Sequence, residues 1–267
     1  VLAGGGINSP ALLLRSQAPD PHERVGKRTF LHLVNFSAAQ FEQVINPFYG
    51  APQSVYSDHF QWDDGTAGRM SYKLEVPPMQ PALAATLLGR FGVDNALRME
   101  QLPHTNVMLA LMRDGFHPDS AEGSVELRGD GTPVLDYRMT DYTWDGLRRA
   151  FHSMAEIQFA AGAKAVLPIH AAAEYVKSPA EARALIDRLE LRLFQTRLGS
   201  AHVMGGCATG EDAKSAVTDS LGRHHQLENL SIHDGSLFPT SIGANPQLSI
   251  YGLTAKLATL LAERLKA

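Results

Sequence analysis

The pattern of apolar and polar positions predicts a strand followed by a helix at each end of the chain. Apolar residues 1–3 enter a run of three glycines, and residues 11–14 are again apolar. Ser9 before Pro10 predicts a helix with Ser9 as N-cap and Pro10 at its first position. Residues 230–239 predict a short strand, and residues 246–265 a closing helix. The apolar side of that helix is made of Leu248, Leu253, Leu257, Leu260 and Leu261.

The middle of the chain has a different pattern. Alternating or β-rich stretches at 54–60, 70–76 and 107–112 predict strands of an antiparallel sheet, and residues 124–137 predict a hairpin around Gly129 and Gly131. A helix is predicted at 81–91 and a long amphipathic helix at 141–164. Its apolar face carries Leu147, Phe151, Met154, Ile157 and Ala161. We expect the helices to cover one face of the sheet.

Two strand-helix pieces that bracket an antiparallel middle predict a chain that leaves one domain, builds another and returns. We therefore expect a mixed α/β fold, with terminal segments 1–26 and 213–267 in one domain and an inserted domain at 27–212. Because the first residues already read as a strand entering a turn, we also expect the protein to have residues upstream of this chain.

Composition narrows the possible functions. A chain of 267 residues with 44% hydrophobic content can bury a sizeable core. Its formal net charge of -4 gives no broad cationic surface for nucleic acid or anionic lipid, which favours small polar or neutral ligands. No apolar run approaches the roughly 20 residues of a membrane-spanning helix. The single cysteine, Cys207, excludes an intrachain disulfide and is predicted to be a packed small residue.

The first glycine turn has part of a dinucleotide-binding fingerprint. Gly4 and Gly6 follow a predicted strand and precede a helix, but Ser9 stands at the third glycine position. No acidic residue follows at the end of a second strand at the required distance. The turn is better explained as one that lies against a cofactor bound mainly by other residues.

Three segments in the last third of the chain carry the strongest motif. His202 is followed by Val-Met-Gly-Gly-Cys, Asp234 and Gly235 by Ser-Leu-Phe-Pro, and Asn245 by Pro-Gln. In this order they resemble the C-terminal region of the glucose-methanol-choline (GMC) oxidoreductases. The opening Gly-Gly-Ile-Asn-Ser-Pro also resembles a signature of that family, with Gln17 where a glycine is usual.

Other positions bear on the subgroup. The Ala-Asn-Pro-Gln version is closest to the long-chain alcohol oxidase and cholesterol oxidase-like branches, which differ from members with a second histidine. The chain departs from the common family pattern at Val203, Ala208 and Thr209. These departures affect the assignment of a substrate more than that of the chemistry.

The resemblance implies an FAD enzyme that oxidises an alcohol CH–OH group to a carbonyl. The ends of the chain would form part of a Rossmann-like FAD-binding domain, and the inserted segment would form the substrate domain. The family's N-terminal ADP-binding βαβ portion is not among these residues, so we expect the chain alone to bind FAD poorly. The implied cofactor contacts are Ala3, Gly4, Asp234, Gly235, Asn245 and Pro246. Asp234 is alternatively a turn residue that caps Ser236.

The chemistry of such a reaction supports two catalytic residues. Transfer of a hydride from the alcohol carbon leaves a carbonyl only if the hydroxyl proton is also removed. His202 could accept that proton, or as an imidazolium could stabilise alkoxide character, and these roles stay open. Asn245 would donate a hydrogen bond to the same oxygen. With Pro246 it also has the form of an N-cap, which would place the positive end of the last helix near an anionic flavin.

The remaining candidates have ordinary structural explanations as well. His32, His59, His104 and His170 could line a substrate pocket or be satisfied core histidines. His224 and His225 lack a zinc-like ligand set, so no metal is expected. An apolar pocket or plain core packing would explain the residues Met99, Met108, Met112, Phe48, Tyr49 and Trp62. Alternative functions are a flavin-dependent lyase and a non-catalytic relative; the alcohol, the electron acceptor, the oligomeric state and the localisation stay open.

Overall fold

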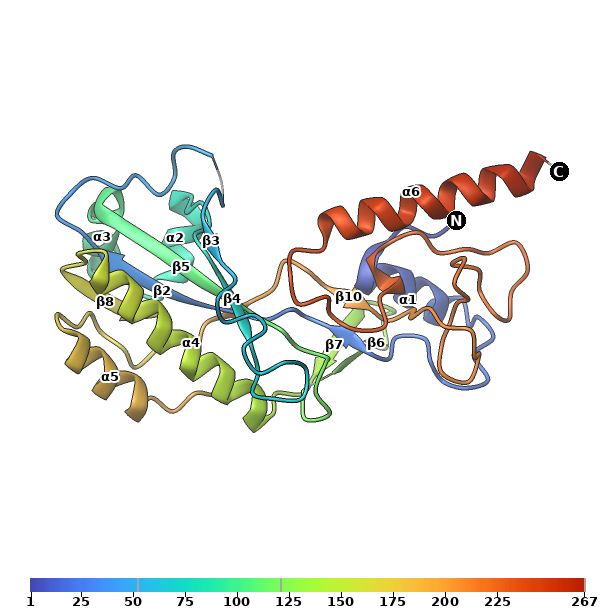
Figure 1. The fold of residues 1–267 in the computed structure, drawn as a ribbon, viewed down its shortest axis with the longest axis horizontal. Coiled ribbons are helices and arrows are strands. Elements are labelled where there is room, and N and C mark those ends of the chain that lie inside the picture. The colour runs from blue at the N-terminus through green and yellow to red at the C-terminus, as the bar shows by residue number, and fades with distance from the viewer. Residues whose placement is uncertain (52, 121, 267) are drawn as a thin grey trace. The chain divides into compact units, whose positions relative to one another are not determined.

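The computed structural model describes residues 1–51, 53–120 and 122–266, and the chain forms two compact units (Figure 1). The first unit comprises Val1–His32, Arg113–Thr140 and Ser200–Ala267. The second comprises Leu33–Met112 and Asp141–Gly199.

The second unit is built on an antiparallel sheet with the strand order β3-β4-β5-β2-β8. β2 is central, because it pairs with β5 over its whole length and with β8 and β9 on the other side. The strands are β2 Val34–Gln40, β3 Tyr56–Ser57, β4 Tyr72–Glu75, β5 Thr105–Met112, β8 Ala165–Pro168 and β9 Leu198–Gly199. The antiparallel sheet predicted from the sequence is therefore confirmed.

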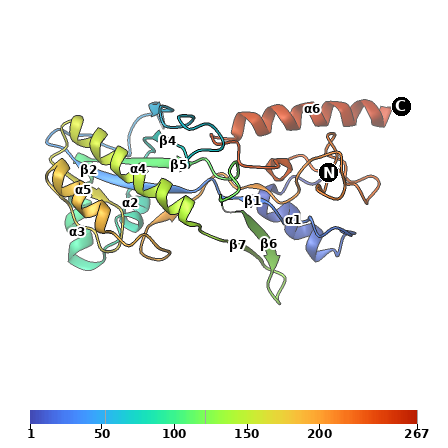
Figure 2. The same cartoon turned by 60° about the horizontal axis from the view of Figure 1, so that its bottom comes forward.

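Helices contact both faces of this sheet, although one face was predicted. On one face, Ser37 of β2 donates a 2.7 Å hydrogen bond to Gln158 of α4. The next residue, Ala38, points the other way and packs in a core cluster with Ala84 and Leu185. In Figure 2, α4 passes in front of the strands, and α2 and α3 lie below them. The helices are α2 Pro81–Leu87, α3 Gly92–Glu100, α4 Asp141–Ala160 and α5 Pro179–Arg188, with the 3-10 turn η1 Leu102–His104 before β5.

The first unit joins the two ends of the chain. Leu2 forms a parallel bridge with Ile232, and helix α1 (Gly5–Arg15) follows. A four-stranded sheet has the order β10-β1-β6-β7. Its strands are β1 Thr29–Phe30, β6 Gly123–Leu127, β7 Pro133–Tyr137 and β10 Met204–Gly205. The unit closes with the 3-10 turn η2 (Gly235–Leu237) and the helix α6 (Gln247–Lys266).

The division differs from the predicted inserted domain at 27–212, because residues 27–32, 113–140 and 200–212 lie in the first unit. The hairpin of β6 and β7 lies in the first unit because Gly123 pairs with Thr29 of β1. Residues 200–212 also lie there, because β10 pairs with β1. A substrate-binding role for the second unit stays a prediction.

Several predicted element ends were wrong for identifiable reasons. Helix α1 begins at Gly5 with Gly4 as N-cap, so Ser9 is not the cap and Pro10 lies inside the helix. The strand predicted at 230–239 is reduced to isolated bridges at Ser231 and Ile232, after which Asp234 caps η2. Helix α4 ends at Ala160, before the left-handed Gly162, which has φ of 94°.

Burial also refines the predicted apolar faces. In α4, Leu147, Phe151 and Met154 have no exposed surface, whereas Ile157 is 38% exposed. In α6, Leu257 is buried and Leu248 is 82% exposed. Cys207 is buried in the core of the first unit, as predicted, and burial raises the pKa of its thiol to about 12. Within the described residues, no helix has both the length and the apolar character that crossing a bilayer requires.

Candidate active site

The segment that carries His202 is held by the pairing of β1 with β10. Thr29 lies opposite Gly205, and Phe30 lies opposite Met204. Gly205 has φ of 82°, and a Cβ atom there would collide with the carbonyl oxygen of Arg28, so only glycine fits. The same antiparallel register, continued by two residues, brings His32 opposite His202.

The two histidine rings are in contact. Nδ1 of His32 lies 3.0 Å from Nδ1 of His202, and the ring centroids are 5.1 Å apart. His32 is fully buried and His202 is partly buried. A second link joins the two turns, since the Ser200 hydroxyl donates to the Leu31 carbonyl and accepts a 3.4 Å hydrogen bond from the His202 amide. His32 is therefore adjacent to the predicted catalytic histidine, which sequence reasoning had not indicated.

The backbone of His32 is in an unusual conformation. Its φ of 51° lies in the left-handed region, where a residue with a side chain costs about 1–3 kcal/mol unless its surroundings hold it. The amide of His32 donates a 3.1 Å hydrogen bond to Oδ2 of Asp114, and the Tyr137 hydroxyl donates to the same oxygen at 2.7 Å. These contacts hold the strained turn in place.

Asp114 is a buried carboxyl with no exposed surface. Burial raises its pKa, while hydrogen bonds from Tyr137, Ser241 and the His32 amide act in the opposite direction. Sequence reasoning missed this residue. The sequence signal was the Arg113-Asp114 pair directly after the apolar run of β5. Charged residues at the end of a buried strand are costly to bury unless they have partners, so such a pair indicates a specific role.

Asn245 lies in the loop that leads to α6. That loop is tied to the same buried pair: Ser241 bonds to Asp114, and the left-handed Gly243 packs against the side chain of Arg113. Helix α6 begins at Gln247, directly after Pro246, and the Pro246 carbonyl accepts from the Ile250 amide. One buried carboxyl thus touches both the segment that contacts His202 and the loop that carries Asn245.

The predicted flavin contacts gather around the bridge between the chain ends. Oδ2 of Asp234 accepts hydrogen bonds from the Gly5 amide at 2.9 Å and the Ser9 hydroxyl at 2.5 Å, and Oδ1 accepts from the Ser236 amide at 2.7 Å. The interpretation of Asp234 as a turn residue that caps Ser236 is confirmed. Its contact with a flavin stays a prediction.

The geometry of this turn fits a bound flavin. Ala3 and Gly4 are exposed, and the Gly4 amide donates a 2.9 Å hydrogen bond to the Ser9 hydroxyl. A Cβ on Gly235 would lie only 3.1 Å from Cδ1 of Ile250, in the first turn of α6, so the turn and the helix start are close together. The N-terminal end of a 20-residue helix stabilises negative charge.

The other predicted histidines have structural partners. His104 Nδ1 contacts the Gln43 carbonyl at 3.1 Å, and His170 Nε2 contacts the Glu190 carbonyl at 3.1 Å. His224 Nδ1 accepts from two backbone amides, and His225 Nε2 contacts the Gly210 carbonyl. His59 is exposed and its ring meets Phe60 edge-on. Across the described ranges, no three histidine, cysteine or carboxylate side chains form a metal-binding group.

The predicted apolar pocket residues do not form one group. Met108 and Met112 are buried, Met99 and Phe48 pack against a core cluster, and Tyr49 and Trp62 are 87% and 52% exposed. Met108 also lines a cavity of about 390 Å³ in the second unit, between α4 and strands β4 and β5. Asn106, Gln158 and Glu75 are among its polar residues.

Comparison with known sequences identifies the family. A sequence profile described as GMC oxidoreductase matches residues 118–254, a little over half of the chain. The chain belongs to the GMC oxidoreductase family. GMC oxidoreductases are FAD-dependent flavoproteins, which agrees with the fit of the turn.

Relatives of this GMC oxidoreductase chain include longer proteins. An uncharacterized GMC-type oxidoreductase of Mycobacterium tuberculosis is 26% identical over 259 residues, which are 97% of this chain and 39% of that protein. The long-chain-alcohol oxidase FAO4B of Arabidopsis thaliana is 25% identical over 284 residues, covering all of this chain and 36% of that protein. The chain thus spans well under half of their length.

Solved structures show the same fold. Pyridoxine 4-oxidase from Mesorbium loti has a TM-score of 0.61 at 17% identity, covering 98% of this chain and 51% of that one. A variant of Aspergillus oryzae formate oxidase has a TM-score of 0.67 at 14% identity, covering 100% and 54%. The mixed α/β fold expected for a GMC oxidoreductase is therefore confirmed.

Proposed function

We propose that the protein oxidises the CH–OH group of an alcohol to a carbonyl, with His202 and Asn245 at the substrate oxygen. The observation that supports it most directly is that Asp114 contacts both the His32 turn, which holds His202, and the loop that carries Asn245. The resemblance to the family's C-terminal motifs points to the same two segments as the carriers of the residues at the substrate oxygen.

The chemistry follows from the side chains. Removal of the hydroxyl proton needs a base beside the oxygen, and the partly buried imidazole of His202 is a group that can accept a proton. FAD, when bound, supplies the acceptor for the hydride. The amide of Asn245 donates to the oxygen and orients the alcohol carbon. Ala3, Gly4, Gly235 and Pro246 would hold the cofactor.

The experiment is anaerobic mixing of the full-length protein with alcohols, from short aliphatic to long-chain and sterol, while the absorbance of oxidised flavin is followed. We expect long-chain alcohols to bleach the flavin fastest, because several relatives are long-chain-alcohol oxidases. His202→Ala should slow flavin reduction about 10²- to 10⁴-fold, the usual contribution of a general base. Asn245→Ala should slow it about 10²- to 10³-fold.

A matched control and two contrary outcomes complete the test. His224→Gln changes a buried histidine outside the site and should keep the wild-type rate. Consumption of an alcohol without flavin reduction would support the lyase alternative. A full-length protein that purifies without flavin would support a non-catalytic relative.

A further inference from the structure

The contact between His32 and His202 has room for only one hydrogen. At 3.0 Å, two imidazole nitrogens form a hydrogen bond only if one carries a hydrogen and the other does not. The Nδ1 atoms of the two rings therefore cannot both be protonated. Either the His202 ring or the His32 ring donates the hydrogen bond.

The two choices leave His202 with different chemistry. If a neutral His202 donates from Nδ1, its Nε2 carries no hydrogen and can accept a proton. If His32 donates, a neutral His202 carries its hydrogen on Nε2 and cannot act as a base there. The hydrogen bond from His202 to His32 is the one that remains when His202 takes up a proton. An imidazolium carries hydrogens on both nitrogens, so its Nδ1 must then donate to His32.

Burial favours the same direction. The ring of His32 is fully buried, so charging it is more costly than charging His202, which is partly exposed. His32 is thus suited to remain neutral and to accept.

We propose that His32 is a positioning residue that accepts a hydrogen bond from Nδ1 of His202 and so leaves Nε2 of His202 as the proton-accepting atom. The inference rests on the proposed function of His202 as a base. It also explains why the strained backbone of His32 is held by the buried carboxyl of Asp114 and the hydroxyl of Tyr137.

The arrangement depends on the backbone as much as on the rings. The Asp114 carboxyl fixes the His32 amide, and the Ser200 hydroxyl links the Leu31 carbonyl to the His202 amide. Hydrogen bonds to the main chain therefore fix the positions from which the His32 and His202 rings extend. A substitution of His32 that tolerates a left-handed backbone and keeps an acceptor should preserve the arrangement.

Asparagine meets both requirements. Its Oδ1 occupies about the position of the histidine Nδ1, and asparagine adopts left-handed φ more readily than most residues. In the full-length FAD-containing protein, we expect His32→Ala to slow flavin reduction at saturating alcohol about 10- to 100-fold, the range typical of a hydrogen-bond partner that orients a metal-bound histidine. We expect His32→Asn to recover most of this loss, KM to change little in either variant, and His224→Gln to leave the rate unaltered.

A second readout does not need turnover. Long-range ¹H–¹⁵N spectra of histidine-labelled protein distinguish protonated from bare imidazole nitrogens, and the His202 signals are identified by their loss in His202→Gln. In resting wild-type protein at alkaline pH, we expect the His202 hydrogen on Nδ1, with this tautomer kept in His32→Asn.

The outcomes separate this inference from the proposed function. A His202 hydrogen on Nε2 in the wild type would overturn the inference, as would equal loss of rate in His32→Ala and His32→Asn. If no alcohol reduces the flavin, the proposed function fails, and the inference that rests on it fails as well. If wild-type protein is reduced but His32→Ala is equally fast, only the inference fails. If His32→Ala does not fold, the spectra of the wild type and His32→Asn still decide.

Discussion

Gln17 is a residue with a side chain at a backbone position that favours glycine. It follows the C-cap of α1 with φ of 50°. The Ala18 amide bonds to the Leu13 carbonyl at 3.0 Å and the Gln17 amide to the Leu14 carbonyl at 3.1 Å, which is the Schellman pattern. Glycine is favoured at this position because a Cβ is strained in the left-handed region, and this explains why the related signature has glycine there.

Replacement of Gln17 by glycine should therefore stabilise the end of α1. We expect Gln17→Gly to raise the free energy of opening of the last turn by about 1 kcal/mol, measured by hydrogen exchange of the α1 amides. Ser16→Gly is the matched control, because Ser16 has φ of -81° and gains nothing from glycine. It should lower the same free energy by roughly 0.5–1 kcal/mol. Equal effects of the two substitutions would contradict the explanation.

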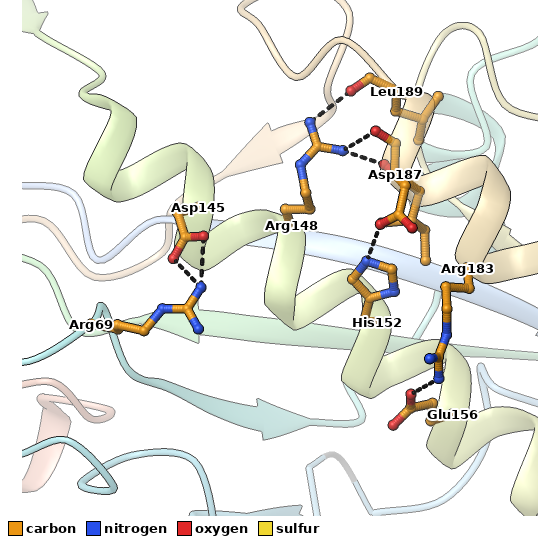
Figure 3. Close-up of polar contacts among 9 residues, drawn as sticks. Arg69, Asp145, Arg148, His152, Glu156, Arg183, Asp187 and Leu189 are labelled. Atoms are coloured by element: carbon orange, nitrogen blue, oxygen red, sulfur yellow. Dashed lines mark hydrogen bonds and ion pairs between the residues drawn. The ribbon is translucent and has the colours of Figure 1, made fainter.

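Among the elements, α5 is held at its C-terminal end by a side chain from α4. The guanidinium of Arg148 donates to the carbonyls of Ile186, Asp187 and Leu189, at 3.3 Å for Asp187 and 2.8 Å for Leu189 (Figure 3). These carbonyls lie at the C-terminal end of α5, where the Ile186 carbonyl also accepts a 3.3 Å hydrogen bond from the Leu189 amide, and the positive charge complements the helix dipole. By contrast, Arg183 of α5 pairs with Glu156 of α4 at 3.2 Å on the surface, where both side chains are more than 60% exposed.

The two arginines should differ in their effect on stability. We expect Arg148→Met to lower the free energy of unfolding of the second unit by about 1–3 kcal/mol, because several carbonyls lose a charged donor. Arg183→Met removes only an exposed ion pair and should change it by less than about 0.5 kcal/mol. Urea unfolding monitored by hydrogen exchange within α5 would compare them. Equal losses would show that the carbonyl contacts add nothing beyond a surface pair.

At the scale of the whole molecule, buried ionisable groups connect stability to pH. Burial lowers the pKa of His170 in the second unit and of His224 in the first. For Asp145, burial acts to raise the pKa, but the hydrogen bonds from Arg149 and Arg69 lower it by more, so the pKa is lowered overall. Asp114 has the opposite shift, because burial raises its pKa.

These pKa shifts change stability with pH in opposite directions. Below the ordinary histidine pKa of about 6.5, the unfolded chain takes up protons that buried His170 and His224 resist, so stability falls with falling pH. The stability from Asp145 is present above about pH 4 and is lost as pH falls through its lowered pKa. Asp114 has the opposite effect on stability. Because its pKa is raised in the folded state, the folded protein takes up this proton at a higher pH than the unfolded chain, which favours folding as the pH falls.

The expected result is a lower free energy of unfolding at pH 5.5 than at pH 7.5, measured by urea denaturation. Replacement of both His170 and His224 by glutamine should flatten this dependence, whatever its effect on stability at pH 7.5. A wild-type stability that rises on acidification over this interval would mean that Asp114 dominates.

Local pattern determined the long elements of this protein. The period of α4, the apolar run of β5 and the turn residues of the β6–β7 hairpin are properties of neighbouring residues, so they were predicted close to their observed positions. Helix α5 could also have been found, because Ser178 and Glu181 around Pro179 form an N-terminal capping signature. The motifs around His202, Asp234 and Asn245 similarly identified the family.

Other features depended on tertiary structure. The central strand β2 was missed because its Asn35 and Ser37 are polar yet buried, and only their partners on α4 make that burial favourable. The partnership of His32 with His202 comes from strand pairing between segments about 170 residues apart. Sequence by itself determined which chemical groups this protein possesses and which family it resembles. Only the tertiary structure decided which groups meet, because contact between distant segments depends on register and packing that no local pattern contains.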